Sequence, residues 1–232
     1  MNKPEDLFKL FDRDRTQKKK LVTIFELDEI KYHFDENINS IRDSFEIIKD
    51  LKEDNKKMDI LRYQIISLDS TIDFYMHEIT KYGMNRMYNG YWEKTEKYNN
   101  FKIEMSDIHK IMISKQDDIF NEVVNKKYAN DTFMTSKSII DQLKLIGISP
   151  KELADNVFYD RNSKENTMDK LKTFLDKLFV RRNLIAHQSD RNHADAEKNS
   201  INEDYVKKQI DMVIKFINGI DTLIRNKDEI DR

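Results

Sequence analysis

The sequence predicts an all-α protein, and three observations lead to this expectation. Only 4 Gly and 2 Pro occur in 232 residues, too few for the frequent tight turns of sheet proteins. Apolar residues recur at steps of three and four, which places them on one face of a helix. Few polar stretches interrupt these segments. We therefore expect long helices packed as an up-and-down bundle with a sizeable core.

The apolar spacing in the N-terminal half of the sequence predicts three helices. The first covers roughly 22–53, and polar residues follow its last apolar positions. The second spans about 58–88, and a polar, aromatic stretch at 88–100 predicts a connection. Apolar spacing over 105–123 predicts the third helix. The first helix has its apolar positions at Leu27, Ile30, Phe34, Ile38, Ile41, Phe45 and Ile48.

In the next part of the chain, residues typical of helix ends mark where one helix stops and another begins. A short helix over about 136–146 stops at Gly147, since glycine readily adopts the left-handed conformation that follows a helix. Directly afterwards, "SPKE" predicts a new helix start. Ser149 is its N-cap, proline takes the first helical position, and Glu152 closes a capping box.

The C-terminal part predicts two long helices separated by polar loops. Residues 159–166 form the first loop, and Asn166 caps the helix that follows it. A second polar stretch covers 189–203. The last helix, 204–226, carries isoleucines and valines in strict steps of four and three.

Composition excludes several classes of protein. The chain has 41 basic and 43 acidic residues, so any contact with nucleic acid must be local rather than a long basic coat. The absence of Cys excludes disulfides, thiolate catalysis and zinc–cysteine sites. The first twenty residues lack the apolar core of a signal peptide, and no run reaches the roughly 18 apolar residues of a membrane span. We expect a cytoplasmic protein with no membrane partner.

The stretch "FVRRNLIAHQSD", residues 179–190, breaks the pattern of its helix. At about 100° per residue, Arg182 falls on the apolar stripe that should face the core. Burying an unpaired guanidinium costs several kcal/mol, so an acidic partner is required. Asp69 and Asp73, four residues apart on the flank of the second helix, are the best candidates. A core-edge arginine paired with one carboxylate is the ordinary interpretation.

His187 does not lie on the apolar stripe that carries Arg182. A five-residue step rotates it about 140° from Arg182, so a straight helix places the two on different faces. His187 aligns instead with Asn183, and lies near Val180 and Leu184. The end of this helix therefore has a second apolar face, which indicates either a partner or contact with the last helix of the same chain.

"RNLIAH", residues 182–187, resembles the signature of HEPN-domain ribonucleases. "STIDFYMHEI", residues 70–79, is similar to an early helix of the RiboL-PSP-HEPN subgroup. The resemblance covers about 58–226. It implies a HEPN-like domain over 58–232 with an N-terminal helical extension over 1–57.

The resemblance implies a metal-independent endoribonuclease without a cofactor. RNA is the substrate, and two motifs meet across a homodimer to form one composite site. His187 would remove the 2′-hydroxyl proton or protonate the leaving oxygen. Arg182 would bind the phosphate, and Asn183 would orient His187 or hold the phosphate. The product would carry a 2′,3′-cyclic phosphate.

Other residues near the motif are candidates for supporting roles. Asp69, like Asp73, is a candidate partner of Arg182, and Asp73 and His77 form either a structural pair or a support of the active site. A metal site is not expected there, because a third and a fourth ligand are missing. The nearby cations could hold RNA, although a solvated helix face explains them equally well. These cations are Lys177, Arg181 and Arg191.

The family also suggests a biological setting and two alternatives. A toxin or an antiviral defence effector would cut cellular or viral RNA, and an antitoxin protein is a possible partner. The first alternative is a non-catalytic helical interaction module that keeps the fold without the chemistry. The second is the HEPN half of a toxin–antitoxin pair whose other member is a nucleotidyltransferase.

Overall fold

The computed structural model describes residues 27–48, 51–113 and 119–230, and it shows the predicted all-α class. Within these residues no strand forms, and one isolated β-bridge joins Arg191 to Lys198. An unlabelled helix covers 27–48. The others are α2 (Asp54–Tyr88), α3 (Glu96–Asn99), α4 (Met105–Ile113), α5 (Ile119–Tyr128), α6 (Ser136–Leu145), α7 (Pro150–Phe158), α8 (Thr167–Gln188) and α9 (Glu203–Ile230).

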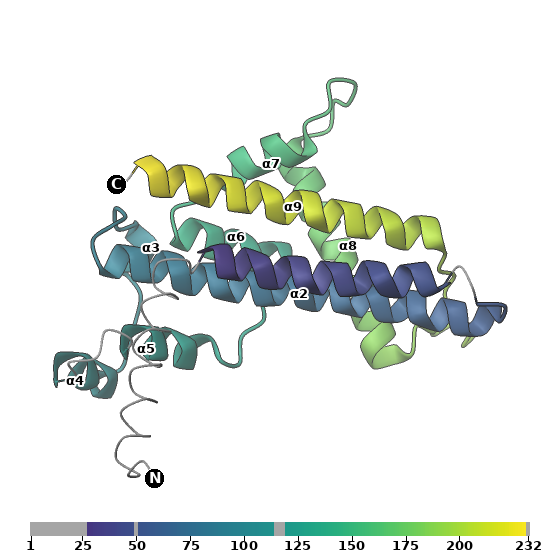
Figure 1. Cartoon of the computed structure of the whole chain (residues 1–232), viewed down its shortest axis with the longest axis horizontal. Coiled ribbons are helices and arrows are strands. Elements are labelled where there is room, and N and C mark those ends of the chain that lie inside the picture. Colours follow the sequence, from purple (N-terminus) through teal and green to yellow (C-terminus); the bar gives the residue numbers. More distant parts are fainter. Residues whose placement is uncertain (1–26, 49–50, 114–118, 231–232) are drawn as a thin grey trace, which may run out of the picture.

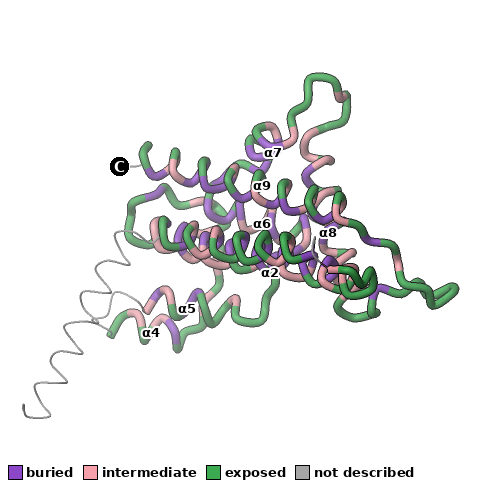
Figure 2. The backbone as a smooth tube through the Cα atoms, turned by 45° about the vertical axis from the view of Figure 1, so that its right-hand side comes forward, coloured by how far each residue is buried: buried purple, intermediate pink, exposed green. Residues whose placement is uncertain are grey.

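Helix α2 is the centre of the fold. It packs against α5, α6, α8 and α9, and the helix over 27–48 lies along it (Figure 1). The rings of Phe34 and Tyr75 meet there edge to face at 5.6 Å. The Gln64 side-chain amide also donates to the Ile41 carbonyl at 3.1 Å. With neighbours on several sides, α2 buries residues around much of its circumference, as Figure 2 shows.

The helices of the N-terminal half differ in part from the prediction. Residues 27–48 are helical, but 51–53 are not, so the predicted end at 53 is wrong. The predicted parts over 22–26 and 49–50 lie outside the described residues. Helix α2 begins at Asp54, four residues earlier than expected. The core is continuous between 27–48 and the rest of the bundle, because the apolar residues of that helix belong to the same buried cluster.

The prediction of one helix over 105–123 is wrong. Two helices, α4 and α5, carry this apolar pattern and pack against each other, and 114–118 lie outside the described residues. Lys126 Nζ lies 3.3 Å from Asp107 Oδ2. A straight helix through both positions would hold them about 28 Å apart, at 1.5 Å per residue. Periodicity alone did not reveal the reversal, because both helices present apolar residues at the same spacing.

The helix ends in the C-terminal half confirm the sequence signals. Gly147 follows α6 with φ of 75°, in the left-handed region. Ser149 accepts a hydrogen bond from the Glu152 amide at 3.2 Å, which is the expected cap of α7. The Glu152 side chain does not bond back to the Ser149 amide, so the expected capping box is only half formed. The Asn166 side chain likewise accepts from the Met168 amide at 2.8 Å and caps α8.

Gly83 sets the distance between α2 and the end of α6. A Cβ atom at this position would lie 2.6 Å from Cβ of Ile146 and 3.0 Å from the Trp92 ring. Because Ile146 Cβ is attached directly to the backbone, it cannot move away as a flexible side-chain tip would. A glycine is therefore required for this approach.

Helix α8 ends abruptly after Gln188. Ser189 and Asp190 both adopt left-handed backbone conformations, with φ of 52° and 58°. The Asp190 amide then donates to the Leu184 carbonyl at 2.9 Å, which closes the last turn. The chain thereby turns back toward α2.

A buried carboxylate fixes this turn. Asp190 is fully buried, and it accepts hydrogen bonds from Arg62 Nε of α2 at 2.7 Å and from Arg181 Nη2 of α8 at 2.8 Å. The Asn199 side-chain amide donates to the other carboxylate oxygen at 3.2 Å. We call these four residues the Asp190 clamp. The clamp joins α2, α8 and the connection to α9 at one point.

We expect Asp190→Ala to lower the free energy of unfolding by about 3–5 kcal/mol, because it leaves two arginines without their buried partner. Urea denaturation of the purified protein measures this change. Asp195→Ala is the matched control, since Asp195 lies in the following loop and is exposed. Among the described residues, its side chain accepts a hydrogen bond only from the Glu197 amide. We expect the control to change stability by less than about 0.5 kcal/mol. Equal effects would contradict the role assigned to the clamp.

Candidate active site at the end of helix α8

Arg182 leaves the buried stripe of α8 and faces α2. Its side chain is 21% exposed, and its Nε lies 3.6 Å from Oδ2 of Asp69, which is almost fully buried. Of the two carboxylates considered as partners, Asp69 is the one that faces Arg182. A separation of 3.6 Å is too long for a hydrogen bond. Neither Asp69 Oδ2 nor Arg182 Nε has a hydrogen-bond partner among the described residues, so their contact is an ion pair alone.

Arg182 also reaches His187 within the same chain. Its Nη1 lies 3.3 Å from Nε2 of His187 and donates to Oδ1 of Asn183 at 3.0 Å. The expectation that the two residues lie on different faces is therefore wrong for the ends of their side chains. The 140° angle describes where side chains leave the helix, and the long arginine extends along the surface to the imidazole. Two subunits are not needed for these groups to meet.

This contact determines which ring nitrogen of a neutral His187 carries the proton. Arginine only donates hydrogen bonds, so Nε2 of His187 must act as the acceptor. In the neutral ring, the proton then resides on Nδ1. His187 is exposed.

Asp69 has an unusually high pKa for a carboxyl group so close to a guanidinium. Burial raises its pKa to about 7; the Arg182 charge opposes this rise, and Asp73 adds to it. The charge of Asp69 therefore changes near neutral pH. When the carboxyl is neutral, the attraction that draws Arg182 toward α2 is weaker.

Asp73 and His77 hold the segment that precedes α6. Asp73 Oδ1 accepts a hydrogen bond from the Phe133 amide at 2.5 Å and lies 3.7 Å from Nε2 of His77. That nitrogen is 3.1 Å from the Asp131 carbonyl, and the imidazole stacks on the Phe133 ring at 4.2 Å. These contacts are those of a structural pair, which is one of the two roles considered from the sequence.

The three cations near the motif have different environments. Arg181 belongs to the Asp190 clamp and also donates to the Ser200 carbonyl at 3.0 Å. Arg191 donates to the Ala196 carbonyl at 2.6 Å and so stabilises its own loop. Lys177 is exposed on α8. Of the three, Lys177 is the best placed to contact a ligand without breaking a structural bond.

An open groove runs along α8 next to these residues. Its volume is about 650 Å³, and we call it the α8 groove. Val180 is 54% exposed in it, Leu184 is half-buried, and Tyr205 of α9 flanks them. The last helix thus covers the second apolar face only in part. The groove is lined by Asp169, Lys172, Thr173, Asp176, Lys177, Val180, Arg181, Leu184 and Tyr205.

The Asp190 clamp was not predicted from the sequence. Arg62 follows the buried Leu61 and is itself buried, so it raises the same question as Arg182: which acid neutralises it? Asp190, immediately after the motif helix, was the acidic residue to consider. Periodicity does not identify such a partner, because 128 residues separate the two in the chain.

The function of this site must be inferred from its own residues. No protein-family model, curated protein or solved structure matches the chain. Among the described residues, no group of three or more His, Asp and Glu side chains is arranged to hold a metal ion. In that same part of the chain, every helix is too short or too polar to cross a membrane.

We expect Asp69→Asn to change how stability depends on pH. The pKa of Asp69 is about 7 in the folded protein against an ordinary 3.8. Between these values the folded state holds more protons than the unfolded state, so the free energy of unfolding falls as pH rises. Asparagine does not titrate. Relative to Asp69→Asn, the wild type should lose stability from about pH 4 to about pH 7 and then level off.

Urea denaturation of both proteins at steps of pH tests this prediction. Asp160→Asn is the control, because Asp160 is exposed and lies in the loop before α8. A constant difference between wild type and Asp69→Asn at all pH values would show that Asp69 has an ordinary pKa.

Proposed function

We propose that this chain is a metal-independent endoribonuclease of the HEPN kind. The observation that supports the proposal best is the contact of Arg182 with both Asn183 and His187 at the exposed end of α8. It unites a phosphate-binding cation, an amide and a titratable imidazole within hydrogen-bond distance. These are the groups required for cleavage of RNA by its own 2′-hydroxyl.

His187 supplies the acid–base chemistry in this proposal. Its unprotonated Nε2 accepts the proton of the ribose 2′-hydroxyl as that oxygen attacks the adjacent phosphorus. The bond between phosphorus and the 5′-oxygen then breaks, and the leaving oxygen takes a proton. One product ends in a 2′,3′-cyclic phosphate, and the other begins with a 5′-hydroxyl.

Arg182 stabilises the phosphate during this step. The acceptors that it now contacts, Asn183 Oδ1 and the His187 ring, carry no negative charge in the neutral state. A phosphate oxygen is a stronger acceptor for guanidinium, so RNA can replace these contacts and release His187 Nε2 for proton transfer. On its other side, the guanidinium Nε lies 3.6 Å from Asp69 Oδ2 without a hydrogen bond, so this contact does not prevent the exchange.

A homodimer would complete the site. Val180 and Leu184 form an apolar surface on the helix that carries Asn183 and His187, and the α8 groove keeps Val180 exposed. A second copy packed on this surface would bring a second imidazole close to the first. One histidine would then act as base and the other as acid. Lys177 in the groove would attract the RNA backbone.

A toxin or an antiviral effector is the setting that we propose for this activity, with an antitoxin as a possible partner. The partly exposed α8 groove equally favours a second function, a helical module that binds another protein. Expression in a bacterial host distinguishes them. A nuclease arrests growth through His187, whereas a module leaves growth unchanged.

We expect His187→Ala and Arg182→Ala each to reduce RNA cleavage by about 10²–10⁴-fold, the usual contribution of a general base or a charge-stabilising donor. Purified protein, structured RNA and EDTA are incubated, and the fragments are separated on a gel. The 2′,3′-cyclic phosphate is identified by mass spectrometry.

His193→Ala is the matched control for this measurement. His193 is also exposed and hydrogen-bonds to Gln188, but it lies in the loop beyond the motif. The control should cleave at the wild-type rate. If wild-type protein leaves several classes of RNA intact in the absence and presence of metal ions, the proposed activity is refuted.

We expect Leu184→Asp to produce monomers, because a carboxylate in the apolar interface would be desolvated without a partner. Light scattering gives the mass in solution, and the same samples are assayed for cleavage. Tyr159→Asp is the control, since Tyr159 is an exposed apolar side chain outside the α8 groove. A monomeric wild type that cleaves RNA would disprove the dimeric site but leave the chemistry of His187 in place.

A further inference from the structure

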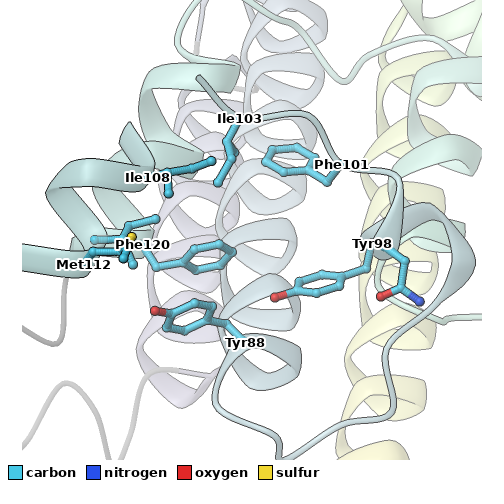
Figure 3. A pocket seen from close by; sticks show the side chains of 9 residues that line it. Tyr88, Tyr98, Phe101, Ile103, Ile108, Met112 and Phe120 are labelled. Carbon is cyan, nitrogen blue, oxygen red and sulfur yellow. The ribbon is translucent and has the colours of Figure 1, made fainter. Parts of the chain in front are cut away.

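An apolar pocket lies at the end of α2, and Figure 3 shows the side chains that line it. Its volume is about 340 Å³, and we call it the α4–α5 pocket. Tyr88 and Phe120 stack in parallel on one side of it, with ring centroids 4.2 Å apart. It is lined by Tyr88, Tyr98, Asn99, Phe101, Ile103, Ile108, Ile111, Met112 and Phe120.

Helix α4, which forms one wall of this pocket, is covered by apolar side chains only in part. It packs mainly on α5, and Figure 1 shows α4 and α5 beside the main bundle. Met112 lines the pocket and is 75% exposed, while its neighbour Ile113 is 82% exposed. Large exposed apolar side chains around an open apolar pocket mark a surface that another apolar segment covers.

The N-terminal end of the described chain lies at the same end of the bundle. Asp28 forms an ion pair with Arg225 of α9 at 2.8 Å. One turn further along α9, Asp228 accepts a hydrogen bond from Arg86 Nε at 3.0 Å. Arg86 precedes the pocket residue Tyr88 by two positions. The chain before residue 27 therefore starts a few side-chain contacts away from the pocket.

That part of the chain, 1–26, is outside the described residues and contains a short apolar motif. Residues 7–11 read "LFKLF", with four large apolar side chains in five positions. Leu7, Leu10 and Phe11 have the spacing of one helical face, and charged residues flank the motif. The fifteen residues 12–26 span about 50 Å if extended and about 22 Å if helical, so the motif can reach the pocket in either form.

We propose that residues 7–11 of this chain dock their apolar side chains in the α4–α5 pocket. The motif supplies the aromatic and aliphatic groups that the pocket lacks on its open side. Docking would bury Met112 and join α4 to the rest of the molecule through the N-terminal segment.

Crosslinking tests the proposal directly, because the chain contains no Cys. Phe8→Cys is combined with Met112→Cys, and the exposure of Met112 makes the second change harmless to the fold. The full-length protein is treated with a short bis-maleimide, and the products are analysed by denaturing gel and peptide mass spectrometry. The control pairs Phe8→Cys with Ile47→Cys, which is 59% exposed and lies twenty residues along its helix from Leu27.

We expect the Phe8–Met112 pair to crosslink within one chain at least five-fold more than the control pair. Equal yields would overturn the proposal. Crosslinked dimers through the same pair would also overturn it, because the occupant would then be a second copy.

A second measurement uses the native pocket. Leu7→Asp/Phe11→Asp should raise the fluorescence of the apolar dye 1-anilinonaphthalene-8-sulfonate severalfold, because the pocket opens. Thr16→Asp/Gln17→Asp, which adds the same charge outside the motif, should leave the signal unchanged. Unchanged fluorescence in the first variant would again refute docking. Both readouts are independent of RNA cleavage.

Discussion

The burial of α2 around much of its circumference is the constraint on which the structure depends. The exposed face of a helix at the centre of a bundle is too narrow for all of its polar residues. Several of these residues are therefore buried. Arg62 and Asp69 are two of these. Each faces an opposite charge at or just after the end of α8: Arg182 for Asp69, and Asp190 for Arg62, which also pairs with Asp59 of α2. These two charge pairs thus help to position α8, the helix that carries the proposed site, against α2.

The two carboxylates, Asp190 and Asp69, differ in the hydrogen bonds that they receive. Asp190 receives hydrogen bonds from two arginines and an asparagine, so its charge is well compensated. Asp69 faces Arg182 at 3.6 Å without a hydrogen bond. The first pair holds the backbone of α8, and the second leaves a guanidinium partly free to exchange partners. A rigid frame with one adaptable cation is well suited to phosphate binding, because the helix stays fixed while the side chain responds.

The sequence predicted the long helices and their caps, because periodicity and capping are local properties. It also indicated that Arg182 needs a carboxylate of α2, since burying an unpaired charge costs several kcal/mol in any fold. It did not predict that Arg182 touches His187, because that depends on the side-chain torsions of a long residue. The reversal between α4 and α5 was missed because both helices share one apolar spacing. The partnership of Arg62 with Asp190 was missed because 128 residues separate them.

The hairpin after α8 has a practical consequence. The Asn199 amide donates to the Asp190 carbonyl at 2.8 Å, and Arg191 bridges to Lys198, so the two ends of this loop are tied together. The residues between them, including His193 and Asp195, are exposed. Lengthening a loop whose ends are already joined adds little entropy cost. A peptide epitope or a fluorescent label inserted there would report on events a few residues from His187 without displacing α8.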